Sequence, residues 1–150
     1  MMLNNVQKPG CSNEPPEYAN HGKCSFKSDV YSFGVTVLEI VSGRTNYCYT
    51  PKPIFIFHYA WMLWNEGKAV DLVDESLEGA FPVEEALRCI QVGLLCAQEE
   101  PYDRPDMHSV IKMLEGEELI LEPLHPAIPI YDDAVFGRDA AFENDEALEK

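Results

Sequence analysis

The chain has 150 residues, of which 46% are hydrophobic, and its formal net charge is -15 at pH 7. This length suits one domain with a real core, and the strong negative charge argues against nucleic acid or an anionic membrane surface as a partner. The acidity is greatest near the C-terminus, since residues 115–150 hold eleven acids and two bases, against fifteen and nine in residues 1–114.

The first predicted helix is apolar almost all the way round. Residues 1–16 before it show no periodicity and contain Pro, Gly and Asn, which predicts a loop. Ser25 and Ser28 are candidate N-caps, and the helix runs to about Ser42, with Gly43 as its stop. A helix with so little polar face must be surrounded by other elements.

Three further helices follow in the sequence. The spacing of the apolar residues places them at residues 56–67, 82–98 and 104–116. Gly67 and Gly116 supply stop signals, and Pro82 suits a helix start. The helix at 82–98 is the clearest amphipathic case, because its apolar residues recur at intervals of three and four.

The connecting segments carry weaker signals. Residues 45–53 are rich in Tyr and Pro and are predicted to be a loop, and residues 69–77 are predicted to be a turn of helix within a loop. The chain after Glu122 contains several prolines and then a sparse acidic run, which predicts disorder. We find no convincing strand alternation and no internal repeat.

Cysteine usage and hydropathy bear on the compartment. The five cysteines form no C-x-x-C pair: Cys11, Cys24, Cys48, Cys89 and Cys96. We interpret them as reduced core residues of a cytosolic protein, and the four histidines show no metal-ligand spacing with them. The N-terminus lacks the apolar core of a signal peptide, and the run Val30–Val41 is too short and interrupted to span a bilayer. A soluble, cytoplasmic chain without a metal is expected.

Three blocks of sequence resemble one known family. PPEYANHGKCSFKSDVYSFGVTVLEIVSGR, from Pro15, resembles the stretch from the A-P-E motif through the central helix of eukaryotic protein kinases, in particular plant receptor-like serine/threonine kinases. YAWMLWNEGKAVDLVDESL and EEALRCIQVGLLCAQEEPYDRPDMHSVIKMLEG resemble later helices of that family, in the same order. The resemblance implies a mainly α fold: a truncated C-lobe of a protein kinase-like fold, with a central buried helix and about three further helices.

The resemblance also divides the chain. It covers residues 15–116, a partial kinase C-lobe. Residues 1–14 are expected to be a leader that does not match, and residues 117–150 an acidic tail predicted to be disordered. The segment PGCSNEP, residues 9–15, departs from the threonine and glycine-tyrosine that usually precede A-P-E in the family.

Three charged residues take structural roles from the resemblance. Asp29 matches the acid at the head of the central helix, which in the family binds backbone amides of the catalytic loop; by itself it could simply favour the helix dipole. Glu17 matches the acid of A-P-E and Arg104 the arginine before the last helix, which form a buried ion pair in the family. A guanidinium can hold a carboxylate with two hydrogen bonds, so we expect Glu17 and Arg104 in buried, nearly bidentate contact.

The resemblance assigns four residues to the core of the central helix: Phe33, Thr36, Val37 and Ile40. In the family, the catalytic loop and earlier helices cover one side of this helix, so these residues are expected to lose part of their cover here. Thr36 departs from the larger aliphatic residue that is usual at its position.

The catalytic motifs of the family are not found in the sequence. A kinase must cradle phosphates, hold magnesium and position a hydroxyl. The chain has no G-x-G-x-x-G, V-A-I-K, H-R-D or D-F-G, and SVIK at 109–112 lies inside the last predicted helix. It begins where the family's catalytic machinery has already ended. We therefore expect no catalytic, cofactor-binding or metal-binding residue in this chain, whereas ATP and Mg serve the parent family.

Three functional hypotheses follow. The first, which we favour, is a catalytically incompetent part of a receptor-like Ser/Thr kinase, whose parent carries out ATP-dependent phosphorylation in signalling from the plasma membrane, with a cytoplasmic kinase domain. The second is a non-catalytic interaction module that docks on an intact receptor-like kinase, its missing lobe or its partners. The third is an unrelated acidic helical scaffold. Nucleotide binding distinguishes an enzyme from the rest, and co-purification with an intact kinase would favour the second.

Overall fold

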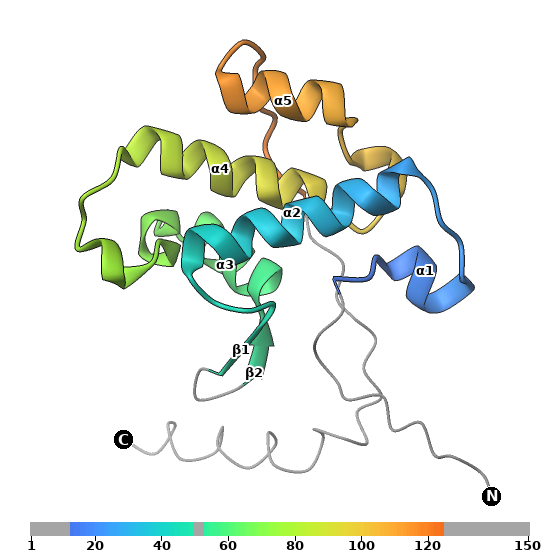
Figure 1. The fold of residues 1–150 in the computed structure, drawn as a ribbon, viewed down its shortest axis with the longest axis horizontal. Helices are drawn as coiled ribbons and strands as arrows, with labels where there is room; N and C mark the ends of the chain where they lie inside the picture. Colours follow the sequence, from blue (N-terminus) through green and yellow to red (C-terminus); the bar gives the residue numbers. More distant parts are fainter. Residues whose placement is uncertain (1–12, 50–52, 125–150) are drawn as a thin grey trace, which may run out of the picture.

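A computed structural model describes residues 13–49 and 53–124 (Figure 1). Most of the expected leader and the part of the expected acidic tail beyond residue 124 lie outside these residues. Within the described ranges the elements are α1 (Pro16–His21), α2 (Phe26–Ser42), β1 (Tyr47–Tyr49), β2 (Pro53–Phe55), α3 (Ile56–Asn65), η1 (Ala69–Leu72), η2 (Glu75–Leu77), α4 (Val83–Cys96), η3 (Pro101–Asp103) and α5 (Met107–Glu115), where η marks a 3-10 helix. The predicted mainly α fold is confirmed.

The long helix α2 crosses the molecule beside α4 and is the element around which the others are arranged (Figure 1). Its start is fixed locally, because the Ser25 backbone N–H donates to Ser28 Oγ at 3.0 Å. Its end is fixed by Gly43, whose φ of 67° lies in the left-handed region that favours glycine. Both signals were readable in the sequence.

Two glycines bring α2 and α4 into close contact. A Cβ placed on Gly34 would lie 2.5 Å from Cys96 Cβ and 2.7 Å from the Gly93 carbonyl oxygen. A Cβ placed on Gly93 would in turn lie 2.9 Å from a methyl carbon of Leu38. A larger residue at Gly34 would clash with the α4 backbone, and one at Gly93 would require Leu38 to shift, so the two backbones pack closely against each other.

The core consists of two clusters on either side of this crossing. The first joins α2, α3 and α4 and includes Val35, Leu38, Phe57, Ala60, Ile90 and Leu94. The second joins α2, α4 and α5 and includes Val30, Val92, Leu95, Cys96, Val110 and Met113. Helix α2 contributes to both clusters, which explains why its sequence is apolar along its whole length.

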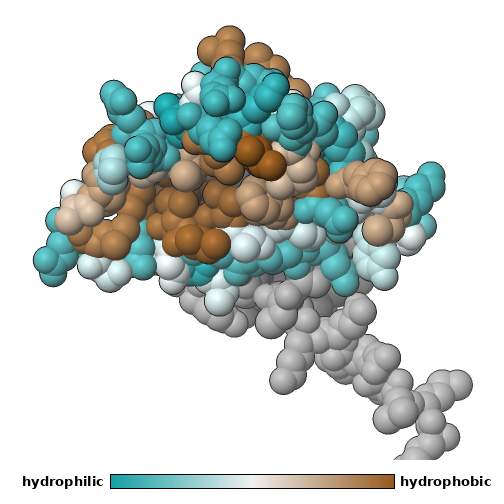
Figure 2. All heavy atoms as spheres, turned by 45° about the horizontal axis from the view of Figure 1, so that its top comes forward, coloured by the Kyte–Doolittle hydropathy of each residue, from teal (hydrophilic) through white to brown (hydrophobic). Residues whose placement is uncertain are grey.

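The row of Phe33, Thr36, Val37 and Ile40, which the resemblance places in the core of the family's central helix and expects to lose part of its cover here, is only partly covered in this chain. Ile40 is 74% exposed and Thr36 is exposed, while Phe33 and Val37 are half-buried. The described helices pack mainly against the opposite face of α2. Phe33 still packs against the second core cluster, whereas Thr36 and Ile40 stay exposed. In the view of Figure 2, apolar residues gather in a broad area across the middle of the molecule, over α2 and α4.

The predicted helices correspond to α2, α3, α4 and α5. The bounds of α2 agree with the prediction, whereas α3, α4 and α5 are shorter at one or both ends than the predicted ranges. The turn of helix predicted at 69–77 is present as η1 and η2. The short elements α1, β1, β2 and η3 were not predicted. α1 lies at the end of the predicted N-terminal loop and in the stretch after it, and β1 and β2 form an antiparallel hairpin in which Tyr47 faces Phe55. Each is too short to show a hydrophobic period.

The cysteines differ in burial. Cys96 is buried, and this burial raises the pKa of its thiol to about 12. Cys89 is half-buried and Cys24 is exposed, so the interpretation as core residues is wrong for Cys24. Cys11 and the side chain of Cys48 lie outside the described part of the chain.

Within residues 13–49 and 53–124, no helix combines the length and the apolar character needed to cross a membrane. Over the same ranges, no three His, Cys, Asp or Glu side chains gather as the ligands of a metal ion would.

Candidate functional site

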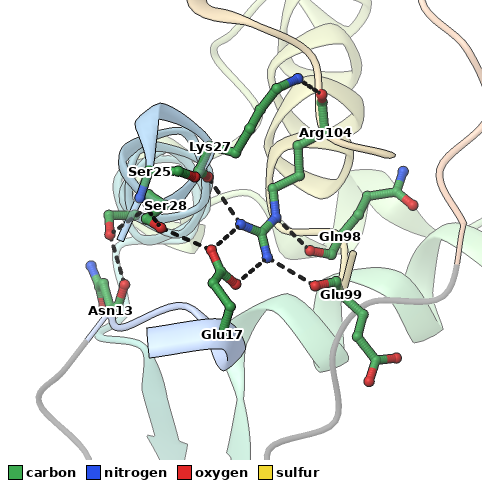
Figure 3. Close-up of polar contacts among 9 residues, drawn as sticks. Asn13, Glu17, Ser25, Lys27, Ser28, Gln98, Glu99 and Arg104 are labelled. Carbon is green, nitrogen blue, oxygen red and sulfur yellow. Dashed lines mark hydrogen bonds and ion pairs between the residues drawn. The ribbon is translucent and has the colours of Figure 1, made fainter. Parts of the chain in front are cut away.

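Arg104 lies between η3 and α5 and is among the largest fully buried side chains, with 1% of its surface exposed. Its guanidinium points into the junction between α1, the start of α2 and the end of α4 (Figure 3). We call this group of contacts the arginine junction. A buried charge is tolerated only where hydrogen-bond partners replace water, so its surroundings decide whether it stabilises the fold.

All five N–H donors of the guanidinium have an acceptor. Nη1 donates to Glu17 Oε1 at 2.7 Å and Nη2 to Glu17 Oε2 at 2.9 Å, which makes the ion pair bidentate. The remaining donors reach backbone carbonyl oxygens of Lys27 at 3.0 Å, Gln98 at 2.7 Å and Glu99 at 2.9 Å. Lysine has neither this planar fork nor this number of donors, so the site requires arginine.

An aromatic ring lies against the guanidinium. The Arg104 Cζ atom is 4.9 Å from the centre of the Tyr31 ring, within the range of a cation–π contact. Tyr31 is itself buried, and its ring meets Phe57 edge to face with 6.1 Å between centroids. The arginine junction is therefore continuous with the first core cluster.

Glu17 is held from a second side by α2. Ser28 Oγ donates to Glu17 Oε1 at 2.9 Å, and the Glu17 side chain is 13% exposed. Burial, the largest single influence, raises the pKa of Glu17, but the hydrogen bonds from Arg104, its own backbone and Ser28, with the charge of Arg104, together outweigh it. The pKa of this carboxyl therefore lies below its ordinary value, and Glu17 is ionised at neutral pH.

Lys27 and Arg104 form hydrogen bonds in both directions, which link α2 to the segment before α5. The Lys27 backbone carbonyl accepts from Arg104, and Lys27 Nζ donates to the backbone carbonyl of Arg104. Asp106 then caps α5 by accepting from the Ser109 backbone N–H at 2.8 Å. We did not anticipate the role of Lys27, because a backbone carbonyl leaves no signal in the sequence.

Asp29 lies in the first turn of α2 and is exposed. The described residues provide no hydrogen-bond donor to its carboxylate, so the expected contact with backbone amides has no counterpart there. Its position agrees with the simpler interpretation, in which an acid near the helix N-terminus interacts favourably with the helix dipole.

A second carboxylate on α2, Glu39, fastens two segments. Glu39 Oε1 accepts from Asn13 Nδ2 at 2.7 Å, and Oε2 accepts from the Asn46 backbone N–H at 3.0 Å. Ser32 Oγ donates to the Asn13 carbonyl oxygen at 2.8 Å, and Asn13 Nδ2 also reaches Thr36 Oγ1 at 3.4 Å. The polar row could have been found in the sequence, since residues 32, 36 and 39 recur at helical spacing.

Comparison with known proteins shows which sequences this chain is similar to. A family model described as protein tyrosine and serine/threonine kinase matches residues 10–114. The putative cysteine-rich receptor-like protein kinase 30 of Arabidopsis thaliana is 44% identical over 115 residues, which cover 75% of this chain and 16% of that protein. Cysteine-rich receptor-like protein kinase 26 of the same plant is 45% identical over 125 residues, which cover 80% and 19%.

A solved structure with the same fold is the pseudokinase domain of BIR2, which is described as an immune regulator of the RLK/Pelle family. Its TM-score is 0.61 at 25% identity, and the match covers 70% of this chain and 32% of that one. The chain thus spans 16% and 19% of the length of the two curated relatives above.

The geometry of the arginine junction predicts a large loss of stability for Arg104→Lys. The variant keeps a positive charge but leaves several carbonyls and one carboxylate oxygen without their donors, so we expect the free energy of unfolding to fall by roughly 3 kcal/mol. Urea denaturation followed by circular dichroism measures this change. The matched control is Lys68→Ala, which breaks an exposed pair with Glu66 and should change stability by about 0.5 kcal/mol or less. Equal stability of Arg104→Lys and wild type would contradict the prediction.

The ionised state of Glu17 predicts a dependence on pH. Because its pKa is lower in the folded chain than the ordinary 4.5, the ion pair stabilises fully above that value, and this stabilisation is lost as the pH falls through the lowered pKa. Wild type should therefore lose stability on acidification more steeply than Glu17→Gln. The pKa values of Asp74 and Asp106 are also lowered by hydrogen bonds from backbone N–H groups. Both residues are present in the two proteins, so their contributions cancel in the difference between the two pH slopes. Denaturation curves with equal pH slopes would refute the assignment.

Proposed function

Because the chain belongs to the protein tyrosine and serine/threonine kinase family, we propose that it is the scaffold part of a receptor-like Ser/Thr kinase and transfers no phosphate on its own. The predicted resemblance to plant receptor-like kinases is confirmed by the relatives and the solved structure. The activity of the parent, ATP-dependent phosphorylation in signalling, and a cytoplasmic position of its kinase domain beneath the plasma membrane are parts of the same proposal.

The arginine junction is the observation that carries this proposal. The resemblance implies that the pair matching Glu17 and Arg104 ties the end of the activation segment to the larger lobe. In this chain the pair is bidentate, its guanidinium is fully hydrogen-bonded, and it rests on Tyr31. Such a junction positions a backbone segment and offers no nucleophile, base or phosphate-binding loop, so its chemistry is structural.

The absence of phosphotransfer rests on the sequence. A phosphoryl-transfer site needs a glycine-rich loop and a lysine at the phosphates, carboxylate and amide ligands for Mg²⁺, and an aspartate that accepts the substrate proton. None of the motifs that supply these groups occurs in the 150 residues. ATP and Mg²⁺ are therefore cofactors of the parent family and not of this chain.

We expect calorimetric titration of the purified chain with ATP and Mg²⁺ to give no saturable binding, and radiolabelled ATP to give no label on the chain or on a generic substrate. An intact receptor-like kinase domain, handled in parallel, provides the positive control for both assays. Phosphotransfer by the purified 150-residue chain would overturn the scaffold proposal.

A second candidate function is docking on an intact receptor-like kinase or on its missing lobe. The observation that favours it is the uncovered face of α2, where Ile40 is 74% exposed and Phe33 and Val37 are half-buried. Exposed apolar patches of more than a few hundred Å² are typical of partner sites or of aggregation. The occupant that suits this face is the set of kinase elements that cover the matching helix in the family.

The uncovered face predicts that the wild-type chain binds a hydrophobic dye and associates with itself. Ile40→Lys should lower both the dye fluorescence and the association while the helical circular dichroism signal stays the same, because it places a charge on the apolar surface. The control is Leu77→Lys, at an exposed leucine of η2, which should leave dye binding unchanged. A wild-type chain that is monomeric, binds no dye and unfolds sharply would show that the face is not a docking surface.

A further inference from the structure

The segment after α5 presents leucines to solvent although it is held firmly against the molecule. Leu119 is 83% exposed, Leu121 is 68% exposed and Leu124 is 58% exposed. Ile120, between the first two, is half-buried and packs against the second core cluster. Over residues 119–121 this alternation is typical of an extended segment with one face on the protein and the other face open. We call residues 119–124 the leucine strip.

Two side chains from earlier helices anchor the leucine strip. Gln91 Nε2, on α4, donates to the carbonyl oxygens of Ile120 at 3.4 Å and Leu121 at 2.9 Å. Trp64 Nε1, on α3, donates to Glu122 Oε2 at 3.1 Å. These contacts hold the strip against α3 and α4, which lowers the cost of ordering it when a partner binds.

The charged residues within and directly before the leucine strip are all acidic. Glu117, Glu118 and Glu122 are exposed, and the sequence from Gly116 to Leu124 holds no lysine or arginine. Two cations lie at the start of this stretch: Arg88 of α4 lies beside Gly116, and Lys112 lies in the last turn of α5. An apolar centre with an acidic rim complements a partner that has an apolar centre and a basic rim.

We propose that the leucine strip is a docking site for an extended peptide segment in which large aliphatic side chains alternate with lysine or arginine. Leu119 and Leu121 would be buried against the aliphatic side chains, and the glutamates would pair with the cations. Within the described residues, the backbone N–H groups of Leu119 and Leu121 have no acceptor, so a neighbouring strand could also pair with them. An anionic membrane, nucleic acid or a second copy of this acidic chain would be repelled by the same glutamates.

This inference goes beyond the scaffold role and does not depend on it. The probe is a fluorescein-labelled peptide of alternating leucine and lysine, titrated with the full 150-residue chain and followed by fluorescence anisotropy. We expect saturable binding, and we expect Leu119→Ser/Leu121→Ser to raise the Kd about tenfold, because two side chains no longer become buried. The matched control is Val70→Ser/Leu77→Ser, at exposed apolar residues next to Asp71, Glu75 and Glu78, which should leave the Kd unchanged.

Two further comparisons separate this proposal from simple attraction between opposite charges. Glu117→Gln/Glu118→Gln should weaken binding and reduce its dependence on salt. A peptide of alternating serine and lysine should bind far more weakly than the leucine peptide. The proposal is overturned if the serine peptide binds as tightly as the leucine peptide, or if the strip variant binds like wild type. It is also overturned if sedimentation shows a wild-type dimer that the strip variant abolishes, since the occupant would then be a second copy.

Discussion

The guanidinium of Arg104 is the group on which the arrangement of the N-terminal half depends. It joins three parts of the chain that share no hydrophobic pattern: α1 through Glu17, the start of α2 through the Lys27 carbonyl, and the end of α4 through Gln98 and Glu99. A helix of six residues is too short to be stable by itself, so α1 holds its place through this contact. The same contact satisfies carbonyls that follow the last turn of α4 and would otherwise lack donors.

Helix α2 packs tightly on one side and is open on the other. On the packed side, Gly34 and Gly93 let the backbones of α2 and α4 meet, and Val35 and Leu38 are fully buried. On the open side, Ile40 projects into solvent. The two apolar sides of α2 therefore have different explanations. One side packs into the core of this fold, and the other side has no covering neighbour among the described residues.

The sequence predicted best those features that are encoded locally. The start of α2 at Ser25, its stop at Gly43 and the amphipathic pattern of α4 depend on residues within one or two turns, and all three could be read directly. The contact between Glu17 and Arg104, 87 residues apart, came from family resemblance, since spacing alone cannot pair two surface charges. The backbone acceptors and the Tyr31 ring could not be predicted, because each depends on which elements surround a residue in the folded chain. The exposure of Ile40 was expected only from the family resemblance, which says which elements cover the matching helix.

The contacts of α2 with the segment before it show how part of the open side is used. Asn13 lies beside Ser32, Thr36 and Glu39, whereas Glu17 lies beside Ser28, so this segment runs antiparallel to the helix. A hydroxyl at position 36 suits this arrangement, because it donates to the Ser32 carbonyl and faces an amide, where a larger aliphatic residue would leave Asn13 without this neighbour. Since the segment follows the polar row of α2, the adjacent apolar row at Val37 and Ile40 stays uncovered. The carboxylates of Glu17 and Glu39 thus fasten the segment before α2 to this helix at two points, while Ile40 on the adjacent row stays exposed.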